Sequence, residues 1–99
     1  MQVQVHSIHF DADQKLIDFI KVKLSKLEQI HDKITKSEVF LRIDHANNNE
    51  NKVTEIKLTV PGKEMFARRQ TKSFEESTDT AVDALRRQIT KHKEKQRQV

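Results

Sequence analysis

The residues best suited to chemistry lie near the end of the chain, where RRQITKHKEKQR occupies positions 86–97 and seven of the twelve residues are Arg, Lys or His. On a helix, three of these cations recur every four residues, about 6 Å apart. We call this set the first ridge: Arg87, Lys91 and Lys95. A second ridge on the other flank consists of Arg86, Lys93 and Arg97. Such spacing suits the phosphates of a nucleic-acid strand, although surface helices also end in Lys and Arg for solubility and to complement the helix dipole.

The net charge supports a polyanionic partner. Residues 1–62 hold nine Lys or Arg and nine Asp or Glu, whereas residues 63–99 hold ten against six, which accounts for the whole net charge of +4. A basic terminal element on a neutral body favours binding to a polyanion. Four of the five Phe residues occupy apolar-periodic positions, and we consider only Phe40 and Phe66 as candidate stacking platforms for bases. Recognition of backbone and shape by Lys and Arg, sensitive to salt, is therefore expected.

Several classes of chemistry are excluded or disfavoured. The chain has no Cys, which rules out disulfides, thiolate metal sites and cysteine catalysis. Its single Gly leaves no glycine-rich phosphate loop. His6 and His9 would point to opposite faces of a strand and make a poor metal pair. We therefore expect no enzyme, cofactor, metal or small-molecule substrate, and the lack of a long apolar run or signal-peptide layout predicts no membrane segment.

The elements that position the cations follow from hydrophobic periodicity. Alternating residues predict strands and a 3.6-residue period predicts helices: strands over 2–10, 38–44, 53–60 and 64–71, and helices over about 13–30 and from Ser73 onward. Val3 and Val5 share one parity in the first strand while Ile8 and Phe10 take the other, which suggests a bulge or a bend near Ser7. Residues 45–51 (HANNNEN) are expected to form a turn or loop.

The helix starts are marked by capping residues. Asp11 or Asp13 is expected to cap the first helix, and Ser73 opens the last with the Ser-x-x-Glu spacing of a capping box. The order β-α-β-β-β-α predicts an α+β domain, with one four-stranded sheet covered on one face by both helices. Residues 1–99 are the length of a single domain, and whether residues 96–99 are ordered before docking stays open.

These features together resemble the short ribosome hibernation-promoting factors, or ribosome-associated inhibitors, of bacteria. The strongest matches are KLSKLEQ at positions 23–29, with Asp32 following, and VDALRRQITKHKEK at positions 82–95. The capped start at Ser73, with Phe74 and Asp79, also matches. Order, spacing and a fit over nearly the whole chain add to these short motifs. The short members lack the extra C-terminal domain by which long members pair ribosomes.

The resemblance implies a fold similar to double-stranded-RNA-binding domains and a cytoplasmic, ribosome-associated protein, monomeric when free. Such proteins dock on the small ribosomal subunit, in the channel shared by messenger RNA and transfer RNA. There they contact ribosomal RNA with basic residues of both helices and inhibit translation in stationary phase or stress. Matching positions imply a set of RNA-contacting residues: Lys23, Lys26, Arg87, Lys91, Lys93 and Lys95. We add Arg86 of the second ridge and Arg68 of the fourth strand to this set.

Three departures from the family pattern are visible. Ala84 stands where the family has a Lys on the first ridge, and Glu75-Glu76-Ser77 replaces a common Tyr-Ala-Ala after the cap. Arg68 and Arg69 stand where family members often carry acids, which moves positive charge onto the sheet edge.

Two alternatives to a ribosome-bound factor stay open from the sequence. A generic double-stranded-RNA binder would use a basic first turn on the last helix, but this turn is acidic. A ferredoxin-like protein-interaction module would need a strand after the last helix, and the closing residues do not resemble one.

Overall fold

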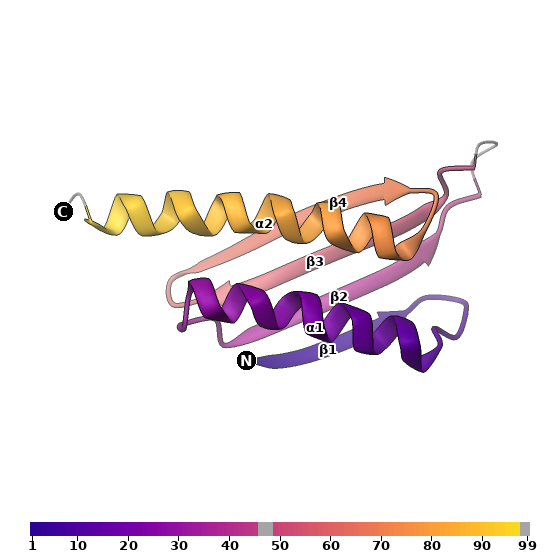
Figure 1. Ribbon diagram of the computed structural model, residues 1–99, viewed down its shortest axis with the longest axis horizontal. Helices are drawn as coiled ribbons and strands as arrows, with labels where there is room; N and C mark the ends of the chain where they lie inside the picture. Colours follow the sequence, from indigo (N-terminus) through magenta and orange to yellow (C-terminus); the bar gives the residue numbers. More distant parts are fainter. Residues whose placement is uncertain (46–48, 98–99) are drawn as a thin grey trace.

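The computed structural model describes residues 1–45 and 49–97, and its elements follow the order predicted from the sequence (Figure 1). They are β1 (Gln2–Ser7), α1 (Gln14–Ile30), β2 (Lys36–Ile43), β3 (Lys52–Val60), β4 (Lys63–Thr71) and α2 (Phe74–Arg97). The predicted loop over residues 45–51 and the tail over 96–99 lie partly outside the described residues.

The four strands form one sheet in the order β1-β2-β3-β4. β1 runs parallel to β2, with Gln2 opposite Lys36, because the chain returns through α1 between them. The other two pairs are antiparallel. Pro61 and Gly62 form the tight β3–β4 turn, in which Gly62 has a φ of 78° that a residue without a Cβ adopts without strain. The predicted α+β fold is confirmed.

Both helices lie on the same face of the sheet, side by side (Figure 1). Their apolar stripes pack against the inward residues of the strands, which alternate with outward ones as a half-buried sheet requires. The most deeply buried side chains in this core are Ile20, Leu24 and Leu27 of α1, Val39, Leu41, Ile56, Leu58 and Met65 of the sheet, and Leu85 and Ile89 of α2. Burial of each such side chain contributes about 1.5–3 kcal/mol.

The first strand is shorter than predicted, because β1 ends at Ser7 rather than at Phe10. His9 takes a φ of 65°, which turns the chain out of the sheet. Phe10 then stacks on Phe74 at the start of α2, with ring centroids 5.1 Å apart. The change of parity that the sequence shows between Val5 and Ile8 is therefore a bend at the end of the strand.

The helix starts are capped by short polar side chains. Asp13, not Asp11, caps α1, and its carboxylate accepts from the Leu16 N–H at 2.9 Å. Ser73 caps α2 by accepting from the Glu76 N–H at 3.1 Å. The N–H of Ser73 donates to the Thr71 hydroxyl at 3.4 Å, so Thr71 takes the part that the capping box assigns to Glu76. In the described part of the chain, none of the helices is long and apolar enough to cross a membrane.

The end of α1 carries a buried histidine. His31 is 6% exposed, its ring stacks on His92 of α2 with centroids 5.9 Å apart, and its Nδ1 accepts from the Lys33 N–H at 3.3 Å. Burial lowers the pKa of His31 below its ordinary value of 6.5, and the nearby charges of His92 and Lys93 lower it further. Protonation of this imidazole therefore opposes folding.

This shift predicts a pH dependence of stability. Since the folded pKa of His31 lies below the unfolded value, its contribution is fully present above about pH 6.5 and is lost as the pH falls towards the folded pKa. We expect the free energy of unfolding, measured by urea denaturation between pH 5 and 7.5, to fall with pH more steeply in the wild type than in His31→Gln. Parallel curves for the two proteins would show that His31 does not titrate with unfolding.

Candidate nucleic-acid interface

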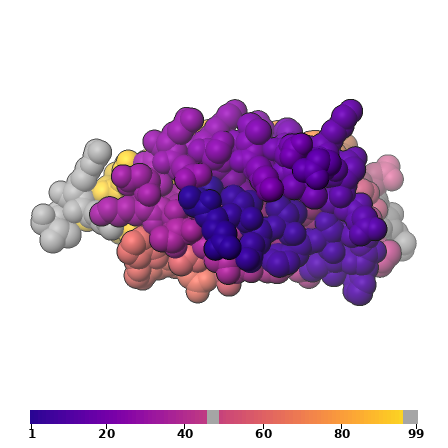
Figure 2. Space-filling model, turned by 90° about the horizontal axis from the view of Figure 1, so that it is seen from below, coloured from indigo at the N-terminus to yellow at the C-terminus, as the bar shows by residue number. Residues whose placement is uncertain are grey.

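The first ridge lies on α2, whose 24 residues reach beyond the sheet at their C-terminal end (Figures 1 and 2). Ile89 is the last buried residue of this helix for which side-chain burial is described. Lys91 and Lys95 are exposed and form no ion pair within residues 1–45 and 49–97. Arg87 is 74% exposed and bonds to Asp83, one turn earlier, at 2.7 Å. The ridge thus presents two unpaired ammonium groups and one guanidinium with a single acidic neighbour.

In the second ridge, Lys93 is the residue with a described contact to α1. Lys93 is half-buried, and its Nζ donates to the backbone carbonyl of Ile30, the last residue of α1, at 2.7 Å. Arg86 is 48% exposed and lies 3.9 Å from an oxygen of Asp83. The side chain of Arg97 lies outside the described part of the chain. Lys93 follows the buried Ile89 by four residues, so the two are neighbours on the helix surface. This spacing was a sign in the sequence that Lys93 lies beside the apolar stripe.

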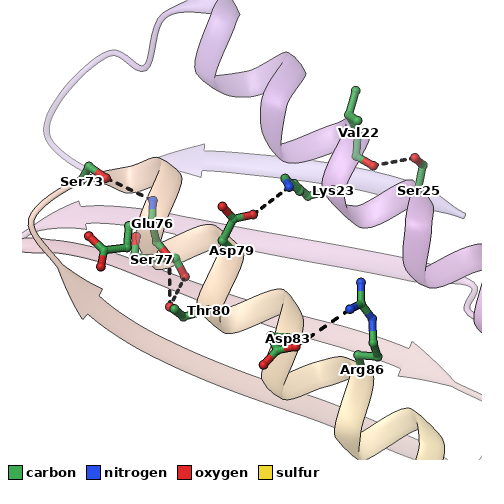
Figure 3. A network of polar contacts seen from close by, with 10 residues as sticks. All are labelled: Val22, Lys23, Ser25, Ser73, Glu76, Ser77, Asp79, Thr80, Asp83 and Arg86. Carbon is green, nitrogen blue, oxygen red and sulfur yellow. Dashed lines mark hydrogen bonds and ion pairs between the residues drawn. The ribbon is translucent and has the colours of Figure 1, made fainter.

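Lys23 lies between the two helices. Its Nζ is 2.9 Å from a carboxylate oxygen of Asp79 on α2 (Figure 3). The same atom lies 5.4 Å from the centroid of the Phe19 ring. The Lys23 side chain is 28% exposed. It therefore bridges α1 and α2, and its positive charge is already partly neutralised.

Lys26 occupies the next position outward on α1. Its side chain is exposed and has no polar partner among the residues that the structure describes. It follows Lys23 by three residues, so the two cations are neighbours on the helix surface. Of the two cations assigned to α1, Lys26 is the one free to meet an external anion.

A shallow hollow marks the outer side of α2. Its volume is about 390 Å³, and its walls come from one helix and expose mostly the apolar stems of long polar side chains. The lining residues are Arg86, Arg87, Thr90, Lys91 and Glu94. The lining carries three cations against one carboxylate, so the net charge around the hollow is positive.

Arg68 lies apart from the helix cations. Met65 and Ala67 of β4 are buried under the helices, so Arg68 projects from the opposite, open face of the sheet. Its guanidinium donates to Gln70 at 3.5 Å, and it lies opposite Glu55 in the β3–β4 register. The structure thus brings together seven of the sequence-predicted residues on the helices and leaves the eighth on the other side of the sheet.

The open face of the sheet carries paired charges and aromatic rings. Phe40 stacks on His6, with centroids 4.9 Å apart, and Phe66 is 50% exposed. Although desolvation acts to raise the pKa of Glu38, the charges of Lys36, Lys57 and His6 bring it below its ordinary value. Among the described residues, no group of three or more potential ligands could hold a metal ion.

Fold and surface together define a small α+β protein with two helices on one face of its sheet and exposed cations near the end of α2. The chain belongs to the family described as Sigma 54 modulation protein / S30EA ribosomal protein, whose model matches residues 3–97. This confirms the family that the sequence motifs indicated.

Named relatives cover almost the whole chain. The ribosome hibernation promoting factor of Pseudomonas putida is 34% identical over 96 residues, which is 97% of this chain and 90% of that protein. The protein of the same name from Escherichia coli K12 is 30% identical over 98 residues, 99% of either chain.

Solved structures share the fold. A ribosomal subunit interface protein from Coxiella burnetii superposes with a TM-score of 0.83 at 20% identity, over 94% of this chain and 98% of that one. The N-terminal domain of Thermus thermophilus Protein Y gives a TM-score of 0.81 at 19% identity, over 93% and 99%.

The bridge between the helices can be measured by a double-mutant cycle on Lys23→Met and Asp79→Asn. Both side chains retain contact with solvent, so we expect a coupling free energy of about 0.2–1 kcal/mol at low salt that approaches zero near 1 M salt. Urea denaturation of the four proteins supplies the values. Coupling above about 2 kcal/mol that persists in high salt would contradict this description of an exposed ion pair.

Proposed function

We propose that the protein is a ribosome hibernation factor that binds ribosomal RNA of the small subunit in the channel for messenger RNA and transfer RNA. Family membership and relatives bearing that name over almost the full length support ribosome hibernation. Occupying the channel would exclude translation ligands and keep ribosomes inactive in stationary phase or stress. The protein acts by occupancy and not as an enzyme, as a cytoplasmic, ribosome-associated factor of one domain over residues 1–99.

The observation that carries the RNA-binding mode is the exposed end of α2. Lys91 and Lys95 protrude past the core without carboxylate partners in the described residues, and Arg87 of α2 and Lys26 of α1 are further exposed cations. Unpaired cations give up little when they meet a phosphate, and they release counterions from the RNA. The acidic first turn of α2, with Glu75 and Glu76, repels phosphates and limits the contact to the C-terminal half of the helix.

The free protein is proposed to be a monomer, because side chains cover the outer edge of β4. The amide of Gln88 donates to the Phe66 carbonyl at 2.8 Å, and the guanidinium of Arg69 donates to the Arg68 carbonyl at 2.8 Å. Backbone groups used in this way do not pair with the strand of a second molecule. A dimer formed by strand pairing at the β4 edge is therefore disfavoured.

The proposed function predicts co-sedimentation with small ribosomal subunits. In sucrose gradients of lysates from stationary cells, we expect the protein in the small-subunit fractions, or in those of whole ribosomes, at low salt. We expect it to dissociate by about 0.5 M salt, because phosphate contacts weaken steeply with salt. Recovery of the protein only in the ribosome-free fractions at low salt would overturn the proposal.

Reversing the charge of the protruding cations tests the interface itself. Lys91→Glu combined with Lys95→Glu should weaken binding to purified small subunits by about 100-fold or more at 0.1 M salt, since two phosphate contacts are lost and become repulsive. Circular dichroism should show an unchanged fold because both side chains are exposed.

The matched control is Lys15→Glu with Lys72→Glu, which makes the same change in charge at exposed sites near the N-terminal ends of the helices. This control should bind within a few-fold of the wild type. Equal losses in both double mutants would mean that net charge, and not the ridge, governs binding.

A further inference from the structure

We infer that Lys93 is a positioning residue that ties the end of α2 to the end of α1, and not one of the residues that contact RNA phosphates. The inference rests on the proposed function only for its effect on ribosome binding. Its basis is the bond from the Lys93 ammonium to the Ile30 carbonyl, 2.7 Å long and partly buried, which joins residues 63 positions apart.

The bond meets a need of α1. The last carbonyls of a helix have no partner within the helix and carry partial negative charge, which a nearby cation stabilises. The last turn of α1 contains no basic residue of its own. Its C-cap, His31, uses its N–H for the Leu27 carbonyl at 3.0 Å, which leaves the carbonyl of Ile30 for an outside donor. Lys93 is that donor.

A second contact supports the same junction. The buried ring of His31 stacks on His92, the residue before Lys93. The two neighbours on α2 thus engage two neighbours at the end of α1, one through a ring and one through a hydrogen bond. We call this pair of contacts the brace: Ile30 and His31 with His92 and Lys93.

The brace acts where the core has ended. Beyond Ile89, the residues of α2 whose side chains are described include none that is fully buried. Without further contacts, a protruding helix end frays, because isolated turns are marginal in water. Lys91 and Lys95 lie on these turns. The brace therefore fixes their position relative to Lys26 before the ribosome is met, and such pre-organisation reduces the entropy lost on binding.

The experiment compares three variants of the full chain: Lys93→Met, Lys93→Gln and Lys91→Met. Lys93→Met and Lys91→Met each lose one positive charge, two positions apart on one helix, so Lys91→Met is the matched control. Lys93→Gln also loses the charge but retains an N–H donor. Two quantities are measured: amide hydrogen exchange of the free protein at residues 27–31 and 90–95, and affinity for small subunits across a series of salt concentrations.

Hydrogen exchange reports the brace directly. In Lys93→Met we expect amides at the end of α1 and in the last turns of α2 to exchange at least about threefold faster than in the wild type, because the carbonyl loses its donor. Lys93→Gln should restore part of the protection, and Lys91→Met should match the wild type. Unchanged exchange in Lys93→Met overturns the brace, whatever the ribosome binding shows.

The salt dependence separates positioning from contact. The slope of log affinity against log salt is negative, and loss of one phosphate contact makes it shallower by about 1. This corresponds to a loss of affinity of about tenfold at 0.1 M salt. We expect that result for Lys91→Met. For Lys93→Met we expect weaker binding, by about threefold or more, with the slope of the wild type. A salt slope that is shallower by about 1 in Lys93→Met overturns the inference, because Lys93 then contacts phosphate.

The two arms keep the inference distinct from the proposed function. If the wild type fails to bind small subunits at low salt, the proposed function is wrong, and hydrogen exchange still decides whether the brace exists. If the wild type binds and Lys91→Met behaves as a phosphate contact, the proposed function stands and Lys93 is judged separately by its own slope.

Discussion

The arrangement of this protein depends on one constraint: two amphipathic helices must bury their apolar stripes on the same face of a four-stranded sheet. Leu24 of α1 and Leu85 of α2 are both fully buried there. Two helices that share one face lie side by side, so one flank of each faces the other. Polar residues on these flanks pair across the gap, as Lys23 and Asp79 do. On the helices, this leaves the outer sides and the protruding end of α2 to meet a partner.

Charge is sorted along α2 in the direction that the helix dipole favours. Acids occupy its first turns and cations its last, and this suits the partial charges at the two ends. In the middle of the helix, Asp83 pairs with Arg87, and Asp79 pairs with Lys23 of α1. Because the carboxylates become scarce towards the C-terminus, free positive charge accumulates where the helix leaves the core. The distribution that stabilises the helix therefore also creates the positive surface on which the proposed RNA contact rests.

The sequence predicted the elements well because capping residues and hydrophobic periods act within a few positions. It failed at the end of β1, since Ile8 and Phe10 look the same whether they continue a strand or turn under a helix. It could predict which residues are cationic and on which helix they lie. It could not predict that Lys93 meets the carbonyl of Ile30, because that contact depends on how elements 63 residues apart pack together. The position of Lys93 beside Ile89 on the helix was the available hint.

The predicted RNA contacts can be ranked by whether a carboxylate lies near each cation. On the open sheet face, Arg42 bonds to Glu55, and Lys57 lies 3.4 Å from Glu64. Arg68 stands opposite Glu55 in the register, so a phosphate near it would meet a carboxylate as well. A phosphate that binds a cation there must either displace its carboxylate partner or lie close to that carboxylate. Salt screening reduces the resulting repulsion but does not remove it. Lys91 and Lys95 form no ion pair among the described residues, although Glu94 lines the same hollow as Lys91. The helix end is therefore the stronger surface for RNA, and Arg68 is the weakest member of the predicted set.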